Sequence, residues 1–245
     1  MLNLAVVQYR PAFGKVEEIL SKVLDLLKYI KEGSIVALPE MWKCGFDYEN
    51  LAEHAEKTED VLEEIKRVSF ERDLTLVGTY PLKLEGKIYN SAILVEKGKI
   101  IGIRHKIKLF PLYEEPKHFT PGIENTVFES YKAKLGILIC FELRFPELSQ
   151  SLRDADILIV PSMWGEKRKE HLKALSRARA IENQSFLMLS NAWGRVGEEE
   201  YAGHSAIYSP WGEVLAFSEK GDSILQVSVE KEQVRRVRKY IPLRF

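Results

Sequence analysis

The sequence predicts an α/β fold with a mixed β-sheet and a layout that occurs twice along the chain. Short apolar runs rich in β-branched residues, typical of strands buried on both faces, alternate with segments whose apolar residues recur at helical spacing. Such alternation is typical of parallel strands joined by helices. Two further strand-like runs are separated by a short turn, which predicts an antiparallel hairpin and makes the sheet mixed.

The first half of the chain begins with a strand and a helix. Residues 2–8 are apolar and β-rich, and apolar side chains recur at helical spacing over residues 16–30. Gly33 stands where a glycine commonly ends a helix. The other elements predicted here are a buried strand at 34–38, a helix around 61–70, a strand at 75–80, and a hairpin of strands 88–95 and 99–105 joined by residues 96–98.

The second half repeats this order after a loop. Residues 106–122 contain three prolines and no clear period, which predicts the loop. The elements predicted after it are strand 135–139, helix 146–153, strand 156–161, helix 167–183, strand 185–191, and strand-like runs at 204–208, 213–217 and 223–229. Because no linker-like stretch separates the halves, we predict one domain, residues 1–245, with internal pseudo-symmetry.

The composition favours a protein that acts on a small molecule or on another protein. The chain has 245 residues, of which 45% are hydrophobic, enough for a sizeable core. Lysine plus arginine and aspartate plus glutamate each total 36, so no net charge attracts nucleic acid or an anionic membrane. Two cysteines make neither a disulfide framework nor a metal-binding spacing, and no signal peptide or membrane-length apolar run is present. We therefore predict a cytoplasmic protein without nucleic-acid or membrane partners.

Cys140 is the first candidate for catalysis. It follows the apolar run 135–139 and precedes Pro146, a residue that suits the first turn of a helix. A cysteine between a strand and a helix has the geometry of a nucleophile held at a sharp turn near backbone N–H groups. The alternative is a buried cysteine that acts as a small hydrophobic residue.

Two charged residues are candidates to assist it. Glu40 follows a buried strand and Pro39, and a carboxylate with a raised pKa beside a cysteine can take the thiol proton and return it to a leaving amine. Lys106 opens the loop, where its ammonium would stabilise an oxyanion together with the backbone N–H of Phe141. The alternatives are a surface or helix-capping glutamate and a solvated lysine in the basic run 104–108.

Other chemistries lack support in the sequence. None of the five histidines stands in a cysteine-protease signature around Cys140. No two histidines have an HxH or HExxH spacing, and a glycine-rich phosphate loop is missing. The sequence therefore gives no support for a Cys-His pair, for metal catalysis or for a phosphate-binding loop.

Three motifs in this order resemble the nitrilase superfamily of carbon-nitrogen hydrolases. They are LPEMW at Glu40, HKIKLF at Lys106 and ICFELRFPEL at Cys140. The similar text continues in YEEPKHFTPG, RARAIENQ and GHSAIYSPWGEVLA, so the resemblance spans nearly the whole chain. It implies a four-layer αββα sandwich with pseudo-twofold symmetry, and homodimers or larger homo-oligomers that associate through helices near the nucleophile.

The resemblance also implies roles for individual residues. Cys140 matches the nucleophile, Glu40 the general base, and Lys106 the cation that stabilises the oxyanion with the N–H of Phe141. Glu115 matches the second glutamate of the family, which orients the lysine, with the adjacent Glu114 as a rival. The implied reaction is acylation of the cysteine by an amide, release of ammonia or an amine, and hydrolysis of the thioester without a cofactor.

Within the superfamily, PEMWKCGF, CFELRFPE and RARAIENQ most resemble the omega-amidase-like branch, which acts on small dicarboxylic monoamides. In that branch an arginine four residues after the nucleophile binds the free carboxylate, and Arg144 stands there. Its alternative is a structural ion pair with Glu147 or Glu142. Trp164 is a candidate pocket wall or a core residue.

The chain departs from the family pattern at three positions. Phe141 and Glu142 replace the usual Tyr-Asp, and Lys108 replaces a histidine, which favours an anionic substrate. We interpret Cys44 as a buried or pocket-lining thiol. An N-carbamoyl amide hydrolase, a nitrilase, and a non-catalytic binding member of the fold remain alternatives.

Overall fold

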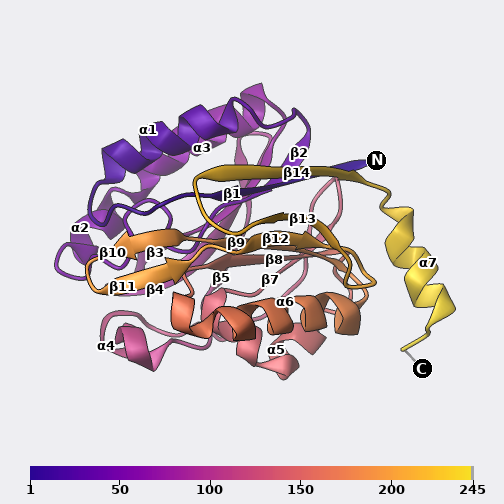
Figure 1. The fold of residues 1–245 in the computed structure, drawn as a ribbon. Helices are drawn as coiled ribbons and strands as arrows, with labels where there is room; N and C mark the ends of the chain where they lie inside the picture. Colours follow the sequence, from indigo (N-terminus) through magenta and orange to yellow (C-terminus); the bar gives the residue numbers. More distant parts are fainter. Residues whose placement is uncertain (244–245) are drawn as a thin grey trace.

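The computed structural model describes residues 1–243 and contains two six-stranded β-sheets that lie face to face (Figure 1). The first sheet has the order β14-β1-β2-β3-β4-β5, in which β1, β2 and β3 are parallel and the other pairs antiparallel. Its strands are β1 (Leu2–Gln8), β2 (Ser34–Ala37), β3 (Thr75–Leu84), β4 (Lys87–Glu96), β5 (Lys99–His105) and β14 (Ser223–Val229).

The second sheet repeats this arrangement. Its order is β13-β12-β9-β8-β7-β6, in which β7, β8 and β9 are parallel and the other pairs antiparallel. Its strands are β6 (Phe128–Glu129), β7 (Lys134–Ile137), β8 (Ile157–Ser162), β9 (Phe186–Asn191), β12 (Ser205–Tyr208) and β13 (Val214–Ser218). Each sheet therefore has one antiparallel outer strand, three parallel strands and two more antiparallel strands. The repeated layout predicted the three parallel strands and the antiparallel strands after them, but not β14 and β6 as outer strands.

Helices cover both outer faces of the paired sheets (Figure 1). The first sheet carries α1 (Val16–Leu27), α2 (Leu51–Glu56) and α3 (Thr58–Glu71), and the second carries α5 (Pro146–Ser151) and α6 (Lys169–Asn183). The short α4 (Glu115–His118) lies in the predicted loop, and α7 (Glu232–Tyr240) extends from one end of the sandwich (Figure 1). The predicted αββα sandwich is confirmed.

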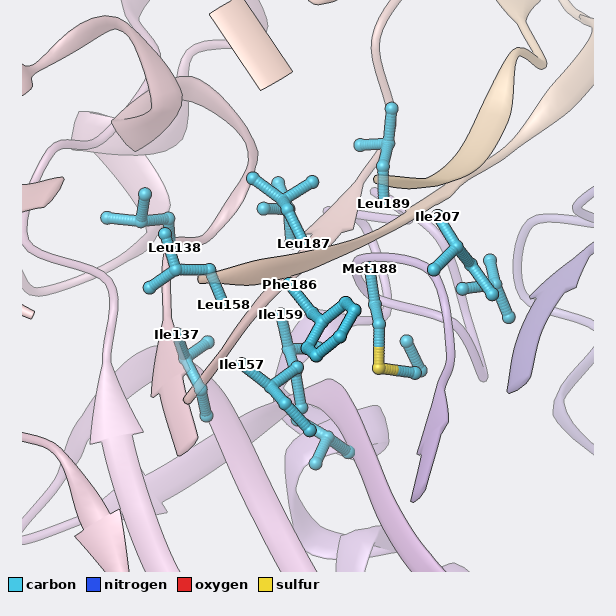
Figure 2. Close-up of a cluster of buried hydrophobic side chains, with 14 of the residues drawn as sticks. Ile137, Leu138, Ile157, Leu158, Ile159, Phe186, Leu187, Met188, Leu189 and Ile207 are labelled. Carbon is cyan, nitrogen blue, oxygen red and sulfur yellow. The ribbon is translucent and has the colours of Figure 1, made fainter. Parts of the chain in front are cut away.

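Alternating side chains along the central strands divide between two hydrophobic layers. On β1, Leu4 and Val6 join the core between the sheets, while Ala5 and Val7 face the layer under α1 and α3. This division follows from the two-residue repeat of a strand, and it explains why these strands are apolar throughout. Figure 2 shows the dense packing of side chains that the second sheet contributes, among them Phe186 of β9.

Some elements were not predicted. They are α2, α4, α7, β6 and the small hairpin of β10 (Trp193–Val196) and β11 (Glu199–Ala202). β14 belongs to the second half of the sequence, but it pairs with β1 in the first sheet. The order of elements along the chain does not specify this pairing. Within residues 1–243, no helix combines the length and the apolar character needed to cross a membrane.

Candidate active site

Lys106 forms ion pairs with two glutamates inside the protein. Its Nζ lies 2.7 Å from Oε1 of Glu40 and 2.6 Å from Oε1 of Glu115, and all three side chains are at most 1% exposed. The alternative of a solvated Lys106 is therefore wrong, because two buried carboxylates replace the water around its ammonium. We call Glu40, Lys106 and Glu115 the lysine cluster.

Glu40 lies where the two sheets meet. It follows β2, and its backbone N–H donates to the carbonyl of Ser162 at the end of β8 over 3.4 Å. Oε1 also accepts a hydrogen bond from Nδ2 of Asn90 at 2.9 Å, whereas Oε2 is buried and has no hydrogen-bond partner in the described chain. One oxygen is thus held in place and the other is free to take a proton.

The loop after β5 positions the other two members of the cluster. The backbone N–H of Lys106 donates to the carbonyl of Asn90 at 2.8 Å, and Oε2 of Glu115 accepts from the N–H of Phe110 at 3.0 Å. Glu114 has a left-handed backbone with φ 55°, and its exposed side chain pairs with Lys117. Glu115 and not Glu114 therefore contacts the lysine.

Cys140 begins a tight 3₁₀ turn, Cys140–Arg144, just beyond β7. Its φ is 49°, a left-handed conformation that costs a non-glycine residue about 1 kcal/mol or more and marks a sharp turn. Burial raises the pKa of its thiol, the negative charge of Glu40 raises it further, and the positive charge of Lys106 opposes both effects. The thiol thus lies within the field of the lysine cluster, and its proton leaves only when a base accepts it.

Burial and the neighbouring charges shift the pKa values of Lys106 and Glu115 in the lysine cluster. Burial lowers the pKa of Lys106, but the carboxylates of Glu115 and Glu40 outweigh it and hold that pKa above its ordinary value. Burial raises the pKa of Glu115 to about 7, with Lys106 opposing and Glu40 adding to the shift. The lysine therefore stays charged, while the carboxylate of Glu115 can take up a proton near neutral pH.

A narrow cavity of about 10 Å³ opens beside the thiol. Its lining residues are Phe110, Cys140, Phe141, Arg144, Met163, Trp164 and Arg168. A larger hollow of about 690 Å³ lies beside α7, but neither cysteine lines it. The chemistry therefore belongs with the smaller cavity.

Two arginines give this cavity positive charge. The guanidinium of Arg144 lies 4.6 Å from the ring of Trp164, and its Nη2 is 3.1 Å from Nδ1 of His171. Within residues 1–243 no ion pair joins Arg144 to Glu142 or Glu147, so the structural alternative for this arginine is wrong. Burial and the charge of Arg168 lower the pKa of Arg144, because two cations lie near each other. Trp164 serves both as a cavity wall and as part of the core.

Three groups near the site were missed by the sequence analysis. Asn90 holds Glu40 and the backbone of Lys106, Arg168 lines the cavity, and Arg104 forms a buried ion pair with Glu142 at 2.7 Å. The basic run had suggested an exposed strand face for Arg104. Glu142 is part of this ion pair and does not line the cavity. The Nζ of Lys108 lies 5.0 Å from the ring of Phe145. Among the described residues, no three His, Cys, Asp or Glu side chains are grouped closely enough to hold a metal ion.

Comparison with known proteins identifies the family. Residues 3–239 match the profile of the carbon-nitrogen hydrolases. This chain belongs to the carbon-nitrogen hydrolase family. It is 31% identical to a 2-oxoglutaramate amidase of Bacillus subtilis over 98% of this chain and 95% of that protein, and 31% identical to an omega-amidase of Xenopus tropicalis over 99% and 93%.

The fold agrees with this assignment. A carbon-nitrogen hydrolase superfamily protein of Xanthomonas campestris superposes with a TM-score of 0.92 at 23% identity, covering 98% of this chain and 95% of that one. The predicted membership of the nitrilase superfamily is confirmed, and the chain is a hydrolase of carbon-nitrogen bonds.

Proposed function

We propose that this enzyme hydrolyses the amide of a small, carboxylate-bearing molecule through a thioester on Cys140. The observation that carries the proposal is the buried lysine cluster beside a strained cysteine that lines a cationic cavity. Burying a lysine and two carboxylates is costly unless they are paired, and active sites are where such arrangements concentrate. A non-catalytic binding role would not require this arrangement.

Acylation begins with proton transfer from the thiol of Cys140 to the free Oε2 of Glu40. The thiolate sulfur attacks the amide carbon, and the carbonyl electron pair moves onto oxygen. The ammonium of Lys106 and the backbone N–H of Phe141 stabilise this oxyanion. The oxyanion then collapses, the carbon-nitrogen bond breaks, and Glu40 returns its proton to the nitrogen, which leaves as ammonia.

In deacylation Glu40 again acts first as a base and then as an acid, with water as the nucleophile. Glu40 takes a proton from water, the resulting hydroxide attacks the thioester carbon, and the carbon-sulfur bond breaks with return of the proton to the sulfur. Glu115 keeps Lys106 in position and balances its charge through both steps. The net reaction converts an amide and water into a carboxylic acid and ammonia.

The cavity favours a short substrate with an anionic end. The cavity is narrow, which disfavours a bulky substrate, and Arg144 presents a planar guanidinium that can bind a carboxylate through paired hydrogen bonds. Arg168 adds a second positive charge at the same cavity. The names of the two amidase relatives agree with this substrate class. N-carbamoyl amides and nitriles use the same three catalytic residues and remain the alternatives.

A substrate panel tests the proposal. Ammonia release is measured from glutaramate-like and succinamate-like monoamides, an N-carbamoyl amide, a nitrile, and an uncharged amide of matched length. We expect the monoamides to have the highest kcat/KM. Arg144→Ala should raise KM for them at least tenfold and leave the uncharged amide within about twofold, because only the carboxylate contact is lost.

Two outcomes would contradict the substrate assignment. If no carboxylate-bearing amide releases ammonia, or if Arg144→Ala leaves KM unaltered, the substrate assignment is wrong. Lys167→Ala serves as the control for a general loss of positive charge, because Lys167 is exposed and adjacent to Arg168 in the sequence.

The homodimer and the cytoplasmic location stay predictions. Light scattering of the purified protein measures its mass directly, and a monomeric mass of 28.2 kDa at working concentrations would contradict the dimer.

A further inference from the structure

Glu142 makes contacts that no catalytic role explains. Its side chain is fully buried, and Oε2 accepts hydrogen bonds from the backbone N–H of Ile139 and from Nη1 of Arg104, each at 2.7 Å. Oε1 accepts from the backbone N–H of Ile107 at 2.6 Å and from that of Lys108 at 3.4 Å. Both oxygens of one carboxylate are therefore occupied by donors from two separate segments.

These donors flank the proposed catalytic residues. Ile139 immediately precedes Cys140, and Ile107 immediately follows Lys106. Arg104 stands two residues before Lys106, near the end of β5. One carboxylate thus ties the nucleophile turn to a side chain before the lysine and to the backbone after it.

The contacts continue into the helix that follows the turn. Nε of Arg104 donates to Oδ1 of Asn125 at 2.8 Å, and Nδ2 of Asn125 donates to the carbonyl of Leu148 at 2.7 Å and to Oγ of Ser151 at 2.6 Å. Leu148 and Ser151 belong to α5. The segments before, within and after the nucleophile turn are therefore linked through polar side chains, of which Glu142 and Arg104 are buried and Asn125 is partly exposed.

We propose that Glu142 is a positioning residue that sets the distance between the thiol of Cys140 and the ammonium of Lys106. The strained φ of 49° at Cys140 needs surrounding contacts to hold it, and the bond from Ile139 N–H to Glu142 lies directly before that residue. A displacement of about 1 Å between reacting groups can lower a rate by about 10²-fold. The inference rests on the proposed function, in which thiol and lysine act on the same carbonyl.

Glu142→Gln tests the proposal with little change in shape. The amide would direct an N–H group at one of the two sets of donors, so one segment loses its acceptor. We expect kcat to fall about 10²-fold with KM within about threefold. The rate at which iodoacetamide alkylates Cys140, followed by peptide mass spectrometry, should fall about tenfold. Alkylation needs no substrate, so it tests the positioning even if the proposed amides are not hydrolysed.

Glu96→Gln is the matched control. Glu96 is also buried and accepts hydrogen bonds from Thr75, Ser130 and the N–H of Tyr131, but it pairs with the start of β3, at the edge opposite Glu40. It should change kcat and alkylation by less than about twofold, while thermal melting measures the stability that each variant loses. Equal losses of activity in both variants would overturn the positioning role, and so would full activity of Glu142→Gln.

A double variant separates positioning from charge balance. Arg104→Met with Glu142→Gln removes both charges, so no buried charge is left unpaired if the single variant fails to fold. The single amide oxygen at position 142 can accept from Ile139 or from Ile107 but not from both, so kcat should stay about 10²-fold low. Recovery of kcat in the double variant would mean that Glu142 only neutralises Arg104, and would refute the proposal.

Discussion

Cys44 and Cys140 are both buried thiols, yet their surroundings differ. Burial raises the pKa of Cys44 to about 12 and also raises that of Cys140. Cys44 is 0% exposed and packs in an apolar cluster with residues such as Met41 and Phe46, while Cys140 is 4% exposed and lines the cavity. The pKa of the resting thiol therefore does not distinguish them.

The distinguishing feature is the neighbouring base. Cys140 lies in the field of Glu40 and Lys106. In the proposed mechanism its proton moves to a carboxylate as the sulfur attacks, and the lysine stabilises the charge that forms. Cys44 has Lys43 as its nearest favourable charge, but the Nζ of that lysine donates to the carbonyl of His54 at 2.5 Å. A buried cysteine becomes a nucleophile when a proton acceptor is built beside it.

Replacing each cysteine should give the largest contrast. Cys140→Ala should lower kcat by about 10⁴-fold or more, because no thioester forms, whereas Cys44→Ala should stay within about threefold. Ammonia release at equal protein concentration measures both, with circular dichroism to verify folding. Ammonia release that persists in Cys140→Ala would show that this thiol is not the nucleophile.

Removing the second carboxylate should have an intermediate effect. Glu115→Gln should lower kcat about 10²-fold because Lys106 loses one of its two ion pairs. Glu114→Gln is the control, since that exposed side chain contacts Lys117 instead, and it should leave kcat unchanged. A similar loss in both variants would contradict the assignment of Glu115.

The pH profile sharpens the same comparison. The pKa of Glu115 is raised to about 7, so this carboxylate is charged above that pH and gains a proton below it. We expect kcat/KM of the wild type to fall on the acid side with a midpoint near pH 7, as the cluster loses negative charge. In Glu115→Gln the fall near pH 7 should be lost, because the carboxylate that titrates there is removed. If kcat/KM of this variant still falls with a midpoint near pH 7, a group other than Glu115 causes the fall.

Alkylation should give the smallest but most direct contrast. Iodoacetamide should modify Cys140 at least tenfold faster than Cys44, since Cys140 lines a cavity and has a base beside it. Glu40→Gln should reduce the rate at Cys140 alone. Equal and slow labelling of both cysteines in the wild type would remove the difference drawn between them.

A short internal repeat illustrates how far sequence reasoning reaches. Residues 38–42 read LPEMW and residues 160–164 read VPSMW, and they end the corresponding strands β2 and β8. The repeat is visible in the printed sequence and could have revealed which strands correspond. That the two ends meet, through the N–H of Glu40 and the carbonyl of Ser162, follows only from the packing of the sheets.

The sequence by itself determined the strand and helix order, the family, and the residues Glu40, Lys106, Glu115 and Cys140 as candidates, because apolar periodicity and short motifs are local properties of the chain. Only the tertiary structure decided which charges are buried. Lys106 and Arg104 belong to one basic run, but each lost its water to carboxylates that lie up to 66 positions away. Ion pairing of this kind depends on how two sheets close on each other, and no local pattern encodes it.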